Sequence, residues 1–147
     1  MFEKNQKKEN FTIIIGCGRL GGNLANTISG ERKDVLVIDK DKEAFKKLSS
    51  SYGGLTMTGD ATDMDVMLEA GIRDADSVVI VTEDDNVNIC VSQMVKEMFG
   101  TPHVIARLYD SERKCVYRES GIDIICPAEL SAKEVRRLMS EEGGQDL

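Results

Sequence analysis

The chain has 147 residues, of which 41% are hydrophobic and 31% are charged, as in an ordinary globular domain. Its formal net charge of −7 disfavours non-specific binding to nucleic acid and adhesion to anionic lipid, because both require basic surfaces. With neither a signal-peptide pattern nor an apolar stretch as long as a membrane span, we expect no nucleic-acid partner and no direct membrane insertion.

Short apolar runs alternate along the chain with longer amphipathic segments. The runs expected to be strands are 11–16, 34–39, 54–58, 77–82, 103–108 and 122–126. The segments expected to be helices are 19–29, 41–50, 63–70, 86–99, 110–119 and 129–141. This alternation predicts an α/β fold: a doubly wound Rossmann-type sheet of about six parallel strands with helices on both faces.

No linker or repeat divides this pattern, so the sequence predicts one nucleotide-binding domain over residues 11–141. Residues 1–10 are polar and aperiodic, and we expect a flexible lead-in there. The acidic, glycine-containing residues 142–147 are expected to form a frayed tail.

A glycine turn follows the first strand, where residues 13–21 read Ile-Ile-Ile-Gly-Cys-Gly-Arg-Leu-Gly. In this pattern Gly16 permits the tight turn, Gly18 allows phosphates to approach, and Gly21 lets the helix pack on the sheet. The N-terminus of that helix favours an anion.

Arg19 lies in the first turn of the expected helix, at the unfavourable end of the helix dipole for a cation. A phosphate held bidentately would explain its position, and an exposed surface arginine is the alternative.

The second strand ends in Asp39, 18 residues after Gly21, followed by Lys40. A carboxylate at this place can accept both hydroxyls of an adenosine ribose and would repel a 2′-phosphate. The alternative is an ordinary polar residue at a strand end.

Three later strand ends also carry polar side chains. Asp60 either accepts from an adenine amine or forms a turn or helix cap before residue 63. Thr82 either contacts the ligand or starts the acidic turn of residues 83–85. Arg107 is either a phosphate or carboxylate contact or a snorkelling edge residue.

The four cysteines lack a C-x-x-C spacing and the chain has one histidine, so we expect no metal site. Cys17 lies inside the glycine turn, where a tolerated small residue is favoured over a reactive thiol. The chain has no recognisable catalytic set, and no proton donor or substrate pocket for hydride transfer is identifiable. We therefore expect a protein that binds a nucleotide and is not an enzyme.

Several segments together resemble the TrkA N-terminal or RCK-N domain family over about residues 11–130. They are Gly16-Cys17-Gly18-Arg19-Leu20-Gly21, Asp39 after a strand, Gly59-Asp60-Ala61-Thr62, Leu68-Glu69-Ala70-Gly71-Ile72, Ala75-Asp76, Thr82-x-x-Asp85, Arg107, Gly121-Ile122-Asp123 and Ile125-Cys126-Pro127.

The resemblance implies a cytoplasmic regulatory subunit of a Trk- or Ktr-type potassium uptake system, peripheral to the inner membrane through a membrane-embedded potassium transporter or channel subunit. It implies binding of NAD(H) or of ATP, ADP or AMP, and a homodimer or higher ring. By analogy, Gly16 to Gly22 with Arg19 and Leu20 would hold the phosphates and Asp39 the ribose. Asp60 and Ala61 would frame the adenine, with Thr82 and Arg107 closing the site.

Two departures from the family pattern are visible. Full-length members carry a second, C-terminal ligand-binding domain, and the given sequence ends soon after the first domain. The glutamate that helps bind a cation in Ktr-type proteins is replaced by Ala128, with Glu129 one residue later. Two other hypotheses are an NAD-dependent oxidoreductase or fragment of one, and a Rossmann-like interaction module without a ligand.

Overall fold

The fold is a six-stranded, fully parallel sheet in a computed structural model that describes residues 10–117 and 120–141. The spatial order of the strands is β3-β2-β1-β4-β5-β6. The strands are β1 (Thr12–Ile15), β2 (Val35–Asp39), β3 (Leu55–Thr58), β4 (Ser77–Ile80), β5 (His103–Arg107) and β6 (Asp123–Ile125). This confirms the predicted doubly wound sheet, and each strand lies within the run expected for it.

The four inner strands β2, β1, β4 and β5 are largely buried and apolar because helices cover both faces of the sheet there, whereas the edge strands β3 and β6 contain no buried residue. In β1, Ile13 and Ile15 face one core while Ile14 faces the other. All three side chains are at most 2% exposed. The continuous apolar run of β1 therefore corresponds to a strand buried on both sides.

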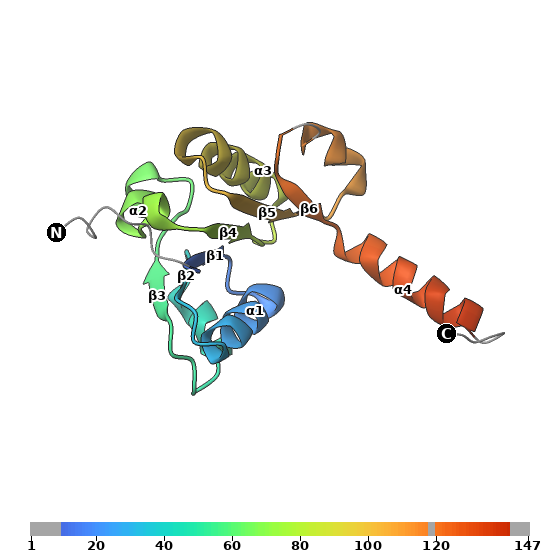
Figure 1. Cartoon of the computed structure of the whole chain (residues 1–147), viewed down its shortest axis with the longest axis horizontal. Helices are drawn as coiled ribbons and strands as arrows, with labels where there is room; N and C mark the ends of the chain where they lie inside the picture. The colour runs from blue at the N-terminus through green and yellow to red at the C-terminus, as the bar shows by residue number, and fades with distance from the viewer. Residues whose placement is uncertain (1–9, 118–119, 142–147) are drawn as a thin grey trace.

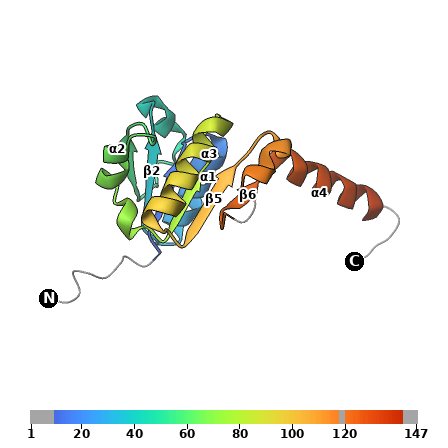
Figure 2. The ribbon, with the colours of Figure 1, turned by 90° about the horizontal axis from the view of Figure 1, so that it is seen from above.

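The helices divide between the two faces of the sheet (Figures 1 and 2). One face is covered by α1 (Arg19–Gly30) and the 3₁₀ helix η2 (Lys42–Lys47). The other face carries the remaining packed helices: α2 (Met64–Glu69), η3 (Ile72–Asp74), α3 (Asp85–Met94), η4 (Val95–Phe99) and η5 (Ser111–Tyr117). Gly100, in the left-handed conformation with φ of 61°, ends η4, as the sequence indicates.

Two helix predictions need correction, because segments 41–50 and 110–119 form short 3₁₀ helices over 42–47 and 111–117. Leu48 is already extended, so the first of these ends after six residues. In this segment Ala44, Phe45 and Leu48 pack against the core, and a short helix is enough to bring them there. The predicted tail, and the lead-in apart from Asn10, lie outside the described residues.

The last helix, α4 (Pro127–Glu141), extends away from the sheet instead of packing on it (Figures 1 and 2). None of its 15 residues is buried. The large side chains of Leu130, Val135, Leu138 and Met139 are 53–68% exposed. Over the described part of the chain, no helix has the length and apolar character needed to cross a membrane.

Candidate functional site

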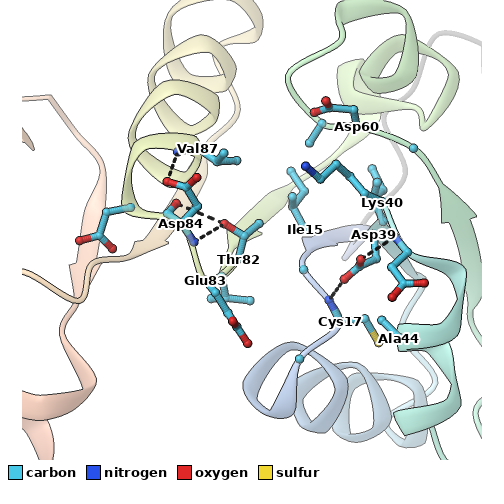
Figure 3. A pocket seen from close by; sticks show the side chains of 18 of the residues that line it. Ile15, Cys17, Asp39, Lys40, Ala44, Asp60, Thr82, Glu83, Asp84 and Val87 are labelled. Atoms are coloured by element: carbon cyan, nitrogen blue, oxygen red, sulfur yellow. Dashed lines mark hydrogen bonds between the residues drawn. The ribbon is translucent and has the colours of Figure 1, made fainter.

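A cleft of about 750 Å³ opens at the carboxyl ends of the strands, between the turns that follow β1, β2, β3 and β4 (Figure 3). This is the place where the strand order reverses, with β2 on one side of β1 and β4 on the other. Ligands of open α/β sheets bind at such a reversal. The volume is within the range of small-molecule sites.

The glycine turn after β1 is fixed by close contacts between backbone atoms. Gly16 has φ of 105°, and a Cβ placed on it would lie 2.9 Å from the backbone nitrogen of Thr82. A Cβ on Gly21 would lie 1.8 Å from the carbonyl oxygen of Gly16. No other residue fits at either position, which confirms a glycine-dependent strand–turn–helix junction.

Gly18 faces open space, since a Cβ placed on it would have no heavy atom within 4 Å. It lines the cleft and precedes α1, whose first turn contains no acidic residue and no side-chain cap. The N-terminus of α1 therefore has no side-chain cap, and the backbone of Gly18 beside it is open to a ligand. An anionic group such as a phosphate fits this environment.

The other predicted residues of this turn lie outside the cleft wall. Arg19 is exposed at the start of α1 and does not line the cleft. Leu20 packs against the core on the α1 side of the sheet. Gly22 is buried beside the Cys17 sulfur and Lys47. Contact of Arg19 with a phosphate stays a prediction.

Asp39 connects the glycine turn to the end of β2. Its Oδ2 atom accepts a hydrogen bond from the backbone N–H of Cys17 at 2.8 Å, and its Oδ1 atom accepts from the N–H of Asp41 at 2.9 Å. The carboxylate lines the cleft and has a structural function in addition to the predicted ribose contact.

Lys40 and Asp60 line the same side of the cleft as Asp39 (Figure 3), and Ala61 also lines the cleft. The Oδ1 atom of Asp60 accepts from both the N–H and the hydroxyl of Thr62, at 2.9 and 2.7 Å. These hydrogen bonds lower the pKa of the Asp60 carboxyl. Asp60 thus forms a turn, while Asp63 caps α2.

The opposite side of the cleft is held by Asn88, a residue that the sequence analysis missed. Asn88 is fully buried; its Oδ1 atom accepts from the N–H and hydroxyl of Thr82, at 3.1 and 2.6 Å. Its Nδ2 atom donates to the carbonyls of Thr82 and Arg107, at 3.0 and 2.9 Å. The sequence contains a signal for this role. Asn88 lies on the helix face that also carries the apolar Val87 and Val91, and a polar side chain on a buried face needs hydrogen-bond partners.

Arg107 is buried beneath this side of the cleft and does not line it. Its Nη2 atom donates to the carbonyls of Val81 and Thr82 at 2.6 and 3.0 Å, and its Nε atom has no hydrogen-bond partner. Its Cζ atom lies 4.9 Å from the ring centroid of Tyr109, which lines the cleft. The guanidinium supports the end of β4, and contact with a ligand stays a prediction.

Cys17 is the cysteine that the described residues place in the lining of the cleft. Burial, and then the charge of Asp39, raise the pKa of the Cys17 thiol, so it stays protonated. Within residues 10–117 and 120–141, no group of three or more histidine, cysteine or acidic side chains could hold a metal ion.

The strand order 3-2-1-4-5-6, with a glycine turn after the first strand and an acid after the second, defines a Rossmann-type domain. This is the class of fold that forms dinucleotide sites at its strand reversal. Residues 12–127 match the family model of the TrkA-N domain. The chain belongs to the TrkA-N family.

Similar proteins agree with this assignment. The Trk system potassium uptake protein TrkA of Streptomyces coelicolor is 38% identical over 135 residues, which cover 92% of this chain and 60% of that protein. Among solved structures, the GsuK channel bound to NAD has a TM-score of 0.76 at 22% identity, over 91% of this chain and 24% of that one. The structure of GsuK bound to ADP has a TM-score of 0.76 at 22% identity, over 92% of this chain and 35% of that one. These two structures support the fold.

Proposed function

We propose that this chain is a nucleotide-binding regulatory domain of a Trk-type potassium uptake system, in which binding of NAD(H) or an adenine nucleotide controls a membrane pore subunit. The observation that carries the proposal is the open face of Gly18 at the N-terminus of α1, beside the Asp39 carboxylate. The relative that is 38% identical is named for potassium uptake, which supports the regulatory context.

In the proposed binding mode, the phosphates lie against Gly16 and Gly18, and Arg19 reaches them from the exposed start of α1. The ribose hydroxyls donate to Asp39, whose two oxygens keep acceptor capacity beyond their present hydrogen bonds. The adenine lies against Asp60 and Ala61. The bound forms of GsuK, with NAD and with ADP, support an adenine nucleotide as the ligand.

The proposed role is regulatory and not catalytic. The side chains that line the cleft include no histidine, within the described residues, and the thiol of Cys17 is held protonated. Hydride transfer needs a proton donor placed beside the cofactor and a pocket for a second substrate. The residues of this cleft favour binding and release of a ligand.

We also propose that two copies pair through α4 and that the assembly acts in the cytoplasm, at the inner membrane through the pore subunit. The exposed Val135, Leu138 and Met139 recur at helical spacing on α4 and form an apolar surface. Apolar surfaces of this kind mark interaction sites. Leu138→Glu should shift the chain to a monomer in analytical ultracentrifugation, whereas Lys133→Glu, at another exposed position of α4, serves as the charge control.

The binding proposal is tested by calorimetric titration of the chain with NAD⁺, NADH, ATP, ADP and AMP, beside an Arg19→Ala variant. We expect binding of adenine nucleotides that weakens about tenfold or more when the arginine is removed, since a bidentate phosphate contact is charge-assisted. Lys33→Ala, at an exposed position after α1, is the matched control. Absence of binding by all five nucleotides would reject the proposal.

A further inference from the structure

The two sides of the cleft carry different charge. The β2–β3 side contributes Asp39, Asp41 and Asp60 together with Lys40 and Lys47, a net charge of −1. The β4 side contributes Glu83, Asp84 and Asp85, a net charge of −3, with no lysine or arginine among the described residues that line it. A bound ligand therefore meets a strongly negative surface at one end.

Two of these three carboxylates already accept hydrogen bonds from backbone N–H groups. Asp84 caps α3 by accepting from Asn86 and Val87, at 2.9 and 3.4 Å. Asp85 accepts from Tyr109 and Asp110, at 2.8 and 3.0 Å. Glu83 is exposed and lies on the side of the cleft opposite Asp39 (Figure 3). Its carboxylate is thus the most available one on this side.

An aromatic ring completes the same side of the cleft. Tyr109 lines it and is 51% exposed, with the guanidinium of Arg107 stacked on the ring. An exposed ring supported in this way offers a flat surface to a planar heterocycle. Carboxylates nearby can accept hydrogen bonds from sugar hydroxyls. Together these groups match a nucleoside better than a phosphate.

We propose that the β4 side selects an uncharged or cationic nucleoside, so that the cleft prefers a dinucleotide of the NAD type over a nucleoside triphosphate. This inference rests on the proposed function, in which the glycine turn holds two phosphates. With those phosphates in place, a third phosphate would extend toward Glu83, where like charges repel. A nicotinamide nucleoside would instead place its hydroxyls near Glu83 and its ring near Tyr109.

The experiment measures dissociation constants of NAD⁺, ADP and ATP for the full chain by calorimetry, with EDTA present to exclude divalent cations. We expect NAD⁺ to bind at least tenfold more tightly than ATP. Glu83→Gln should strengthen ATP binding at least fivefold while changing ADP binding less than twofold. Glu97→Gln, exposed on η4 and outside the cleft, is the matched control and should change none of the three.

A second variant tests the ring. Tyr109→Ala should weaken NAD⁺ about tenfold and leave ADP unchanged, because ADP has no second nucleoside. ATP binding as tightly as NAD⁺, or a Glu83→Gln variant with an unchanged ratio of ATP to NAD⁺ affinity, would overturn the inference while leaving the proposed function intact. Failure of every nucleotide to bind would instead reject the proposed function, and the inference with it.

Discussion

The two walls of the cleft are built in different ways. The wall formed by the ends of β1 and β2 depends on backbone contacts: Gly16 and Gly21 leave no room for a Cβ, and Asp39 accepts from the N–H of Cys17. The wall formed by the end of β4 depends on one buried amide, since Asn88 makes four hydrogen bonds to Thr82 and Arg107.

Because of this difference, we assign positioning of the ligand to the first wall and discrimination between ligands to the second. The shape of the first wall follows from the glycine turn and from the N-terminus of the helix after it. The second wall keeps its shape through the side chains of Asn88, Asp84 and Asp85, while the exposed Glu83 contributes charge. We infer that the first wall holds the part common to all adenine nucleotides and that the second discriminates between them.

Gly21→Ala should have the largest effect, because the new Cβ would lie 1.8 Å from the carbonyl oxygen of Gly16. We expect a loss of about 3 kcal/mol or more in the free energy of unfolding, measured by urea denaturation. Gly30→Ala, at the end of α1 where a Cβ meets nothing within 4 Å, is the control and should be neutral or slightly stabilising. Equal stability of the two variants would show that backbone contact does not fix the first wall.

Asn88→Ala should have the next largest effect, since it removes four hydrogen bonds and leaves the partly buried carbonyl of Thr82 and the buried carbonyl of Arg107 without this donor. We expect a loss of about 2–4 kcal/mol in the free energy of unfolding. Asn23→Ala, at an exposed position of α1, should change it by less than about 0.5 kcal/mol. A small effect at Asn88 would contradict the assignment of the second wall to this amide.

Asp39→Asn should have a moderate effect on stability. The Asp39 carboxylate accepts hydrogen bonds from the N–H groups of Cys17 and Asp41. The amide of asparagine has one oxygen that can accept one of these hydrogen bonds, but its nitrogen cannot accept the other. We expect a loss of about 1–2 kcal/mol in thermal or chemical unfolding. Asp123→Asn, at the exposed first position of β6, is the comparison. Similar losses in the two variants would indicate that Asp39 does not connect the turn to β2.

Glu129→Gln should have the smallest effect, because it lies outside both walls. Lys114 donates to the Glu129 carboxylate at 2.5 Å, and this hydrogen bond lowers the pKa of Glu129. A carboxyl whose pKa is lowered on folding stabilises the fold above its unfolded pKa and loses this contribution as pH falls through the folded value. Any difference between variant and parent in melting temperature at pH 7 should thus become smaller as the pH falls toward 3. A difference that grows toward pH 3 would be inconsistent with this pairing.

Much of the first wall was predictable from the sequence, because its determinants are adjacent along the chain. The run of Ile13 to Ile15, the glycine spacing and an acid after the next apolar run predicted the strand, the turn, the helix and the position of Asp39. Local steric rules are enough to interpret such a pattern.

The second wall could not be predicted in the same way. The bond from Asn88 to the Arg107 carbonyl joins residues 19 positions apart, and that from Arg107 to Val81 spans 26 positions. The contact of Asp85 with the loop after β5 is equally distant in sequence. Whether a polar residue near a strand end faces the cleft or the core depends on such partners, so the sequence alone leaves the alternatives for Arg107 open.

The outward course of α4 has a mechanical consequence. The helix starts at Pro127, two residues after β6, which lies at the edge of the sheet. At 1.5 Å of rise per residue its 15 residues span about 22 Å, so a tilt of roughly 10° at its base would move its far end by about 4 Å. A small change of direction at the edge of the sheet would therefore become a displacement of several ångström at the free end of α4.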